Sequence, residues 1–422
     1  MKKIAFLSPT GTFDNGAEIS IFYLMKVLKA EGYQVINVAP ASFPHLEKSY
    51  REQFATIDVP VFFLPRNKWW WEEAPGLIYG TAGERAASYR DNIAQIRQLL
   101  VSEKVDLLIT NTVNMFQGAV AAACEDLPHF WLIHEFPENE FAYYLDKLDF
   151  VAENSEAVFA VKGQLTTDLQ QKLPSKVVRS FIPYTEVSAT TPQKGQQRRI
   201  VSVGRLTPRK NQLELLEAYH RLSEPRPPLV FIGAWDDEYK KKVDAFIRSH
   251  HLKDVSFTGG KADPWVEVKD QDLCVLPSAM ETFGLVYAEA LLKGVPVIFS
   301  DNPGHLSAYD HFGGGHLYPS GDIAALQKQL TAVLADFPQA VTLAKKQAKS
   351  AREKYQPAIA YGAILEGLQT DLPYQPKPLR HLAAVLSLNE EKSRLTRTEK
   401  RVRQLSNRGK AWLKRRFGNS DS

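Results

Sequence analysis

One stretch of the sequence, residues 273–301, constrains the fold more than any other. It begins with the apolar run Leu273–Leu276, which a Pro-Ser pair stops, and it ends with a second apolar run, Val297–Phe299. Short apolar runs of this kind are typical of strands that are buried on both faces of a parallel sheet. Between them Gly284–Lys293 has helical spacing, and a glycine and then a proline follow where a helix would end. The stretch therefore predicts a strand–helix–strand unit.

The loop of this unit, residues 278–283, is a candidate site. In open α/β sheets, ligands bind at the carboxyl ends of strands, and helix N-termini attract anions. Glu281 lies in the loop and Glu289 in the helix that follows. From the residues alone, three interpretations stay open: a ligand site, an acid/base pair of the glycosidase kind, which needs a fixed carboxyl separation, and two solvated acids near a helix N-terminus.

The segment from Glu281 to Glu289 reads ETFGLVYAE and is followed by Ala290 and the strand sequence GVPV. It resembles the E-x7-E signature of the family 4 retaining glycosyltransferases. The resemblance implies an α/β chain with the GT-B fold, in which two Rossmann-like domains face each other across a cleft. It also implies that Glu281 acts in catalysis by holding a hydroxyl of the sugar, and that Glu289 binds the ribose hydroxyls. The backbone amides of Phe283, Gly284 and Leu285 are then expected to contact the sugar or the phosphates.

A second motif lies upstream, in the sequence IVSVGRLTPRKN of residues 200–211. It predicts a strand, a turn with three cations and the start of a helix. Arg205 and Lys210 flank the turn, so both can contact a polyanion, the arginine as a planar fork and the lysine as a compact charge; a surface charge cluster is the alternative. The pattern VGRL-x3-KN resembles the donor-diphosphate motif of the same family, which implies that Arg205 and Lys210 bind the phosphates.

The first half of the chain begins with a predicted strand, Lys3–Ser8, and a predicted helix, Ala17–Lys29, joined by a loop that contains glycine. A strand, a glycine-containing loop and a helix N-terminus together can hold a phosphate. The resemblance implies that Gly16 faces the donor phosphates, whereas a simple turn is the alternative. The glycines do not form a G-x-G-x-x-G pattern, so NAD is not expected.

His134 follows another predicted buried strand, at the carboxyl end where site residues collect. A single histidine in such a place is often structural. In the resembled family a histidine of the first domain, at a strand end, touches the transferred sugar, and we assign that catalytic role to His134. Its neighbour Glu135 receives no role.

A chain of 422 residues predicts two domains. We expect an N-terminal Rossmann-like acceptor domain over residues 1–185, a polar linker over 186–198 and a C-terminal Rossmann-like donor domain over 199–355. Residues 356–372 are expected to form a helix that crosses back to the first domain. From residue 376 to 422 we expect a basic amphipathic tail, with a short coiled coil and a disordered tail as alternatives.

Charge is unevenly distributed along the chain. Between Lys392 and Arg416, eleven Lys and Arg residues accompany a single acid, so this segment carries +10 and the rest −6 of the net +4. The acidic remainder argues against nucleic-acid binding, whereas the tail predicts a partner such as an anionic membrane surface. No apolar run approaches the roughly 18 residues of a membrane span. We expect a cytoplasmic protein, with peripheral attachment to the inner face of the membrane as an open alternative.

Three smaller features complete the sequence. Cys124 and Cys274 lie in apolar surroundings and are predicted to be buried free thiols. No Asp-x-Asp pair follows a predicted strand, which favours a site without a metal. No permanently bound cofactor is expected. Trp69–Trp71 cannot all face one core, so at least one ring is expected to be exposed, in a loop that contacts the acceptor or a membrane.

These features predict a retaining, metal-independent hexosyltransferase. It would move a hexose from a nucleotide-diphosphate sugar to a glycan or lipid-linked acceptor, in surface polysaccharide synthesis. A non-catalytic GT-B partner subunit and a nucleotide-sugar epimerase are the alternatives. The first need not keep Arg205, Lys210, Glu281 and Glu289, and product analysis would identify the second. The family's usual Gly-Gly turn is replaced here by Asn302-Pro-Gly-His305, so sugar contacts from that turn are not carried over.

Overall fold

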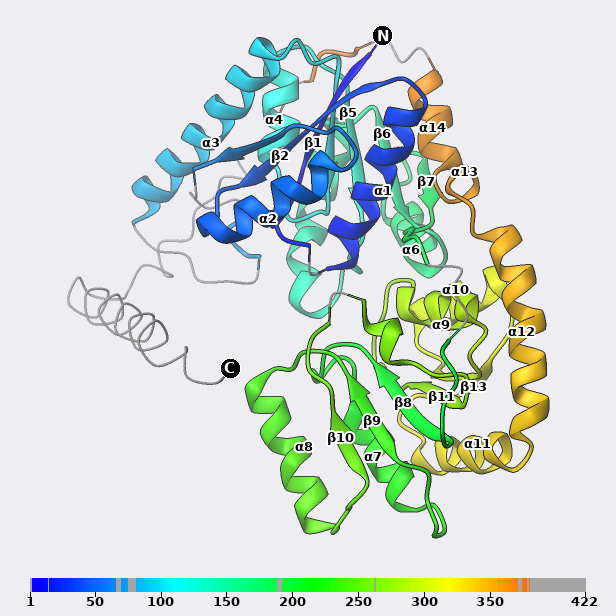
Figure 1. Cartoon of the computed structure of the whole chain (residues 1–422). Helices are drawn as coiled ribbons and strands as arrows, with labels where there is room; N and C mark the ends of the chain where they lie inside the picture. Colours follow the sequence, from blue (N-terminus) through cyan, green and yellow to red (C-terminus); the bar gives the residue numbers. More distant parts are fainter. Residues whose placement is uncertain are drawn as a thin grey trace.

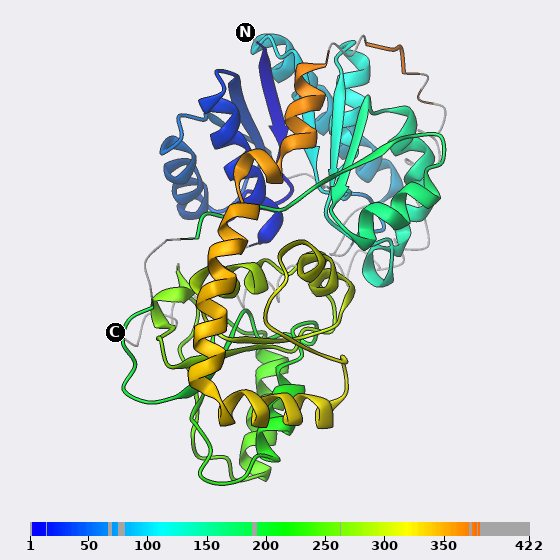
Figure 2. The same cartoon turned by 90° about the vertical axis from the view of Figure 1, so that its right-hand side faces the viewer.

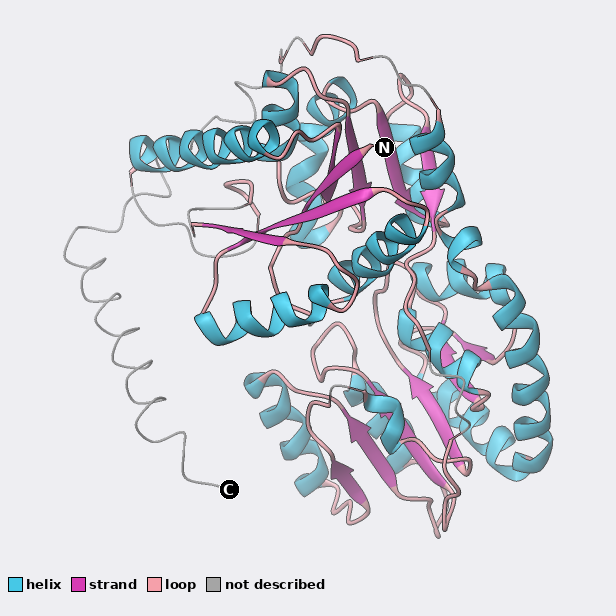
Figure 3. Cartoon of the chain, turned by 45° about the horizontal axis from the view of Figure 1, so that its top comes forward, coloured by secondary structure: helices cyan, strands magenta, loops and turns pink. Residues whose placement is uncertain are grey.

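The computed structural model of the protein describes residues 2–13, 15–65, 70–74, 81–187, 192–261, 263–370, 374–377 and 379. Their strands form two separate sheets, one of seven strands and one of six, in which all neighbouring strands are parallel. Helices cover both faces of each sheet (Figures 1 and 3). The predicted α/β fold with two Rossmann-like units is therefore confirmed.

The first sheet has the strand order β3-β2-β1-β4-β5-β6-β7. The strand order reverses between β1 and β4, and such switch points are where ligands enter open parallel sheets. The strands are β1 (Lys3–Leu7), β2 (Gln34–Pro40), β3 (Val61–Leu64), β4 (Leu107–Asn111), β5 (His129–Ile133), β6 (Ala157–Val161) and β7 (Val178–Phe181). The helices are α1 (Gly16–Ala30), α2 (Pro44–Ala55), α3 (Ala82–Ser102), α4 (Gln117–Cys124), η1 (Asn139–Lys147), α5 (Leu148–Glu153) and α6 (Gln164–Lys172).

The second sheet has the order β10-β9-β8-β11-β12-β13, with its switch point between β8 and β11. Its strands are β8 (Arg199–Val203), β9 (Leu229–Ile232), β10 (Val255–Phe257), β11 (Asp272–Leu276), β12 (Val297–Ser300) and β13 (His316–Tyr318). The helices are α7 (Gln212–His220), α8 (Asp237–Ser249), η2 (Pro264–Glu267), α9 (Leu285–Lys293), α10 (Pro303–Phe312), α11 (Ile323–Ala335) and α12 (Phe337–Lys354).

The strand–helix–strand unit predicted for residues 273–301 is present as β11, α9 and β12. Cys274 pairs with Val297 in parallel register, and the side chains of β11 are all buried. Gly284 and Gly294 flank α9 with φ angles of 76° and 70°. Both lie in the left-handed region, which glycine enters at little cost, so these two glycines fix where the helix begins and ends.

The chain passes twice between the two sheets, and the two passages lie side by side. The hydroxyl of Tyr355, just after α12, donates to the Pro183 carbonyl over 3.0 Å and accepts from the Thr185 amide over 2.9 Å. Beyond it, α13 (Pro357–Ala360) and α14 (Gly362–Gln369) return to the first sheet, where α14 packs on β7. Figure 2 shows this run of helices, in orange, along both parts of the molecule.

Some local expectations differ from the structure. Residues 323–354 form two helices, α11 and α12, because the backbone breaks at Asp336 (φ −121°, ψ 54°) and Pro338 fits only the first turn of a new helix. The helix expected over residues 356–372 is divided between α13 and α14. Cys274 is buried as predicted, but Cys124 is exposed, because it lies in the last turn of the short helix α4, beyond the buried face.

Two predictions concern residues that the structure describes only in part. Of the three tryptophans, Trp71 is buried and Trp70 is half-buried with its indole N–H donated to the Pro9 carbonyl, whereas Trp69 lies outside the described residues. Of the basic tail, only residues 376, 377 and 379 lie within the described residues. In the described part of the chain, no helix is long and apolar enough to span a bilayer.

Candidate active site

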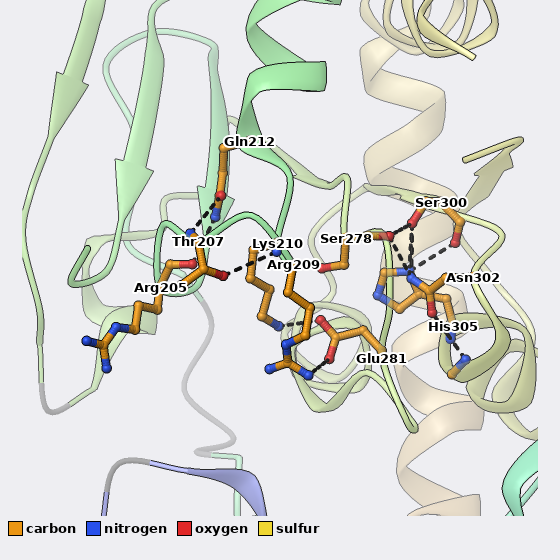
Figure 4. A network of polar contacts seen from close by, with 11 residues as sticks. Arg205, Thr207, Arg209, Lys210, Gln212, Ser278, Glu281, Ser300, Asn302 and His305 are labelled. Carbon is orange, nitrogen blue, oxygen red and sulfur yellow. Dashed lines mark hydrogen bonds and ion pairs between the residues drawn. The ribbon is translucent and has the colours of Figure 1, made fainter. Parts of the chain in front are cut away.

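Two loops meet at the carboxyl edge of the second sheet, beside its switch point (Figure 4). One is the turn of residues 204–211 after β8, and the other is the loop of residues 277–284 after β11. The amide of Ala279 donates to the Arg209 carbonyl over 2.8 Å, so the two loops share a backbone hydrogen bond. The buried Gln212 side chain accepts from the Thr207 amide and donates to the Arg205 carbonyl, which holds the turn in shape.

Glu281 is a buried carboxylate at the centre of this arrangement. Its Oε1 accepts from Lys210 Nζ over 2.5 Å, and its Oε2 lies 3.7 Å from a guanidinium nitrogen of Arg209. Burial alone would raise the pKa of Glu281, but the charges of Lys210 and Arg209 outweigh it and lower the pKa to about 2. Glu281 is therefore ionised at neutral pH, and the predicted phosphate ligand Lys210 is its ion-pair partner.

Glu289, on α9, contacts a different element. Its Oε2 accepts from the indole N–H of Trp265 over 2.9 Å, and Trp265 belongs to η2. Burial raises the pKa of Glu289 to about 7, although the hydrogen bond from Trp265 and the charge of Lys210 act in the opposite direction. The two carboxyl groups of the E-x7-E motif therefore differ: one is held charged by cations, whereas the other lies in a site that favours its protonated form.

Arg205 points away from this ion cluster. It is exposed, and Figure 4 shows its side chain extending to the opposite side of the turn from Glu281. Among the described residues no carboxylate pairs with it. Arg205 is thus a cation at the edge of the sheet that a bound anion can reach without displacing a protein partner.

The turn of residues 300–305, which replaces the family's usual glycine pair, forms one wall of the site. Asn302 caps α10 by accepting from the amides of Gly304 and His305, over 3.1 and 3.0 Å, and its side-chain nitrogen donates to the Ser278 carbonyl over 2.8 Å. A Cβ atom on Gly284 would lie only 2.5 Å from the His305 ring. Asn-Pro is a helix-start signal, so the cap could have been found from the sequence, whereas the contact with Ser278 could not.

The predicted backbone ligands lie at the N-terminus of α9. Phe283 is buried, with its ring edge-on to Phe312, so its side chain supports the loop and only its backbone remains for a ligand. Gly284 and Leu285 follow it into the first turn. A Cβ atom on Gly16, the first residue of α1, would lie 3.0 Å from Leu285 Cδ1. The structure thus brings Gly16 of the first unit against Leu285 of the second.

The loop before Gly16 is shaped by Glu18, to which the sequence assigned no role of its own. Glu18 is fully buried, and its Oε1 accepts from the Thr10 amide, the Thr10 hydroxyl and the Gly11 amide, over 2.9, 2.8 and 3.1 Å. Its Oε2 accepts from the Tyr50 hydroxyl over 2.8 Å. The signal available in the sequence was an acid in the first turn of the predicted helix, two residues after Gly16.

His134 lies at the end of β5, as expected, but it belongs to a separate set of contacts. Its Nε2 is 2.8 Å from Asn111 Oδ1, its ring packs edge-on against Phe181, and burial lowers its pKa to about 3. The ring is therefore neutral and can donate a hydrogen bond or accept one. Glu135 Oε2 accepts from the Val113 and His134 amides, which holds the ends of β4 and β5 together.

The described residues offer no group of three or more His, Cys, Asp or Glu side chains arranged to hold a metal ion. The assignment of Glu281, His134, Arg205, Lys210, Glu289, Gly16, Phe283, Gly284 and Leu285 to the site stays a prediction.

Comparison with known proteins identifies the second unit. Residues 184–354 match the family model described as "Glycosyl transferases group 1", so this part of the chain is a group 1 glycosyltransferase domain. The span contains Arg205, Lys210, Glu281 and Glu289. The predicted membership in the GT-B glycosyltransferases is therefore confirmed for the domain that holds these residues.

Relatives agree with this assignment. The chain is 31% identical over 147 residues to the putative colanic acid biosynthesis glycosyltransferase WcaL of Escherichia coli, a match that covers 32% of this chain and 35% of that protein. It is 22% identical over 227 residues to the uncharacterized glycosyltransferase YqgM of Bacillus subtilis, where it covers 51% of this chain and 58% of the relative. These curated relatives are thus matched over little more than half of their length at most.

Among solved structures, the Anabaena protein Alr3699/HepE in complex with UDP and glucose superimposes with a TM-score of 0.69 at 20% identity. The superposition covers 87% of this chain and 99% of that one. The likeness shows that this chain shares the fold of that protein over the superimposed 87%.

Proposed function

We propose that the chain is a retaining, metal-independent glycosyltransferase that moves a hexose from a nucleotide-diphosphate sugar to a glycan or lipid-linked acceptor. Surface polysaccharide synthesis is the process that fits best, since WcaL is a putative colanic acid biosynthesis glycosyltransferase. The observation that carries the proposal is the cluster of Lys210, Arg209 and Glu281 at the switch point of the second sheet. Arg205 lies exposed on the other side of the same turn, where no carboxylate among the described residues pairs with it.

In this proposal the leaving group is a nucleoside diphosphate, whose negative charge grows as the glycosidic bond breaks. Preorganised cations and backbone amides lower the barrier because they meet that charge where it develops. Lys210 and Arg205 would bind the diphosphate, and the amides at the N-terminus of α9 would contact it or the sugar. Glu289 would bind the ribose hydroxyls, and Glu281 a hydroxyl of the sugar.

The first unit would complete the site with Gly16 and His134. Gly16 already lies against Leu285, so the loop that Glu18 orders would cover the donor. A neutral His134 can donate to or accept from a sugar hydroxyl. Closing the two units over the donor would exclude water and limit hydrolysis.

The proposal is tested first by thermal unfolding with UDP, GDP, dTDP and ADP, each with and without Mg²⁺. A nucleotide at 100 times its dissociation constant stabilises by about 2.7 kcal/mol, and one nucleotide should do so equally well without Mg²⁺. Dependence on Mg²⁺ would refute metal independence. If none of the four binds, the chain is better explained as a non-catalytic partner subunit.

Two variants then locate the site. Lys210→Ala and Glu289→Ala should abolish sugar transfer while the fold is retained, whereas Lys241→Ala, which removes an exposed lysine of α8, should leave transfer unchanged. Proton NMR of the product should show the donor's anomeric configuration. An inverted product would refute the retaining assignment, and release of a changed sugar nucleotide without an acceptor would indicate an epimerase.

A further inference from the structure

Donor binding would draw the positive charge of Lys210 away from the buried carboxylate of Glu281, and a second cation, Arg209, lies close to that carboxylate. In the ligand-free protein the main partner of Glu281 is Lys210, at 2.5 Å. The proposed function also requires Lys210 as a ligand of the diphosphate. A lysine that turns toward phosphate oxygens lengthens or breaks its bond to the carboxylate, and a buried carboxylate that loses its partner is strongly destabilised.

Glu281 is not free to follow the lysine. Its side chain is only 9% exposed. A Cβ atom on Gly304 would lie 2.2 Å from the Glu281 carbonyl oxygen, so the 302–305 turn packs directly on the Glu281 backbone. Asn302 and Ser300 fix the same loop from the other end through the Ser278 carbonyl. Because Glu281 is held in place, a positive charge that replaces Lys210 must move toward the Glu281 carboxylate.

We propose that Arg209 becomes the counter-charge of Glu281 when Lys210 moves onto the donor diphosphate, so that Arg209 is a positioning residue of the transfer reaction. This proposal rests on the proposed function. A guanidinium nitrogen of Arg209 is 3.7 Å from Glu281 Oε2, the oxygen that Lys210 does not bind. Figure 4 shows the two cations approaching Glu281 as neighbours on one turn.

The geometry allows Arg209 to act as this counter-charge, because its backbone is fixed while its side chain can move. Its backbone is held to the Glu281 loop by the hydrogen bond from the Ala279 amide, whereas its side chain is 56% exposed and has room to shorten the contact. The titratable and charged groups that face Glu281 in the described structure are Lys210, Arg209 and His305. Burial lowers the pKa of His305 to about 4, so His305 is neutral at pH 7 and cannot replace Arg209.

The proposal predicts a proton linkage. In Arg209→Gln, donor binding would leave Glu281 without a cation, so the carboxylate should take up a proton when nucleotide binds. The nucleotide from the UDP, GDP, dTDP and ADP panel that stabilises the wild type is titrated calorimetrically at pH 5.5 and pH 8, in buffers of different ionisation enthalpy. At pH 5.5 we expect Arg209→Gln to take up about half a proton more than the wild type.

Affinity should change accordingly. At pH 8 we expect Arg209→Gln to bind the nucleotide roughly tenfold more weakly than the wild type. At pH 5.5 this difference in affinity should be smaller, because a protonated Glu281 needs no positive counter-charge. Arg209→Lys keeps the charge and should resemble the wild type. In the Glu281→Gln background, replacing Arg209 by Gln should add no proton uptake.

Other outcomes would overturn the inference. If Arg209→Gln weakens binding equally at both pH values with no additional proton uptake, Arg209 acts only as a distant positive charge. The same result would follow if Lys210 bridges Glu281 and the diphosphate at once. Failure of the wild type to bind any of the four nucleotides would instead refute the proposed function itself, so the two failures are distinguishable.

Discussion

Asn302 offers a quantitative test of how the wall of the site is built. Asn302→Ala removes the N-cap of α10, which is worth about 1 kcal/mol, and the buried hydrogen bond to the Ser278 carbonyl, worth about 1 kcal/mol more. That carbonyl retains its hydrogen bond from Ser300 Oγ, so the total loss should be about 2 kcal/mol. For a unit of this size each kcal/mol lowers Tm by about 2–4 °C, which predicts a decrease of about 4–8 °C.

Two variants separate the contribution of the N-cap from that of the hydrogen bond to Ser278. Asn302→Ser keeps a capping oxygen but cannot reach Ser278, so it should lose about half as much as Asn302→Ala. Asp322 caps α11 from an exposed position by accepting from the Ala325 amide over 2.9 Å, and Asp322→Ala should lose a cap alone. Nucleotide affinity should fall in Asn302→Ala, because the Ser278–Glu281 loop loosens, and should be unchanged in Asp322→Ala.

The assay is thermal unfolding followed by circular dichroism, combined with nucleotide titration. If Asn302→Ala unfolds within 1 °C of the wild type, the energetic reasoning is refuted. Equal losses in the alanine and serine variants would show that the cap contributes nothing.

Two further predictions follow from other parts of the structure. Burial raises the pKa of Glu289 from 4.5 to about 7, so the folded state holds this proton more tightly than the unfolded chain, and stability is lost as pH rises through that range. The Tm of Glu289→Gln should therefore fall less than that of the wild type between pH 4.5 and 7. Parallel Tm curves for the two proteins would contradict the pKa shift. Gly163, at φ +109°, faces Ser307 across the two units, where a Cβ atom would lie 2.1 Å from the serine hydroxyl, whereas Gly321, at φ +84°, has nothing within 4 Å. Gly163→Ala should thus lower Tm by more than Gly321→Ala, which carries only the backbone strain of about 1–2 kcal/mol, and equal losses would show that this contact adds nothing.

The sequence predicted the parts of the site that local signals encode. The run from Leu273 to Phe299 contains its own strand ends and both helix-flanking glycines, so β11, α9 and β12 could be placed within a residue or two. The carboxyl-edge position of Glu281, Lys210 and His134 followed from the strands that precede them. These features depend on residues close together in the chain.

Contacts between distant residues could not be predicted in this way. Lys210 and Glu281 are 71 positions apart, and their ion pair depends on β8 and β11 being neighbours, which no local pattern states. The hydrogen bond from Trp265 to Glu289 likewise requires η2 and α9 to come within reach of each other. The Asn302 turn was recognised only as a departure from the family, because its role lies in a contact with Ser278 on another loop.

The return of α14 to the first sheet has a consequence for how the protein is made. Its Gly367 lies against Phe159, and Lys2 donates to the Leu368 carbonyl, so the β7 edge of that sheet is covered by residues translated long after it. Ribosomes add about 5–20 residues per second, so the 188 residues from Phe181 to Gln369 take roughly 10–40 s. During that interval the nascent first sheet has an uncovered apolar flank, whereas the sheet of residues 199–318 is complete within one continuous stretch. A chain that stops at residue 355 should therefore leave the first sheet, near the N-terminus, with an uncovered edge, whereas the second sheet would be complete.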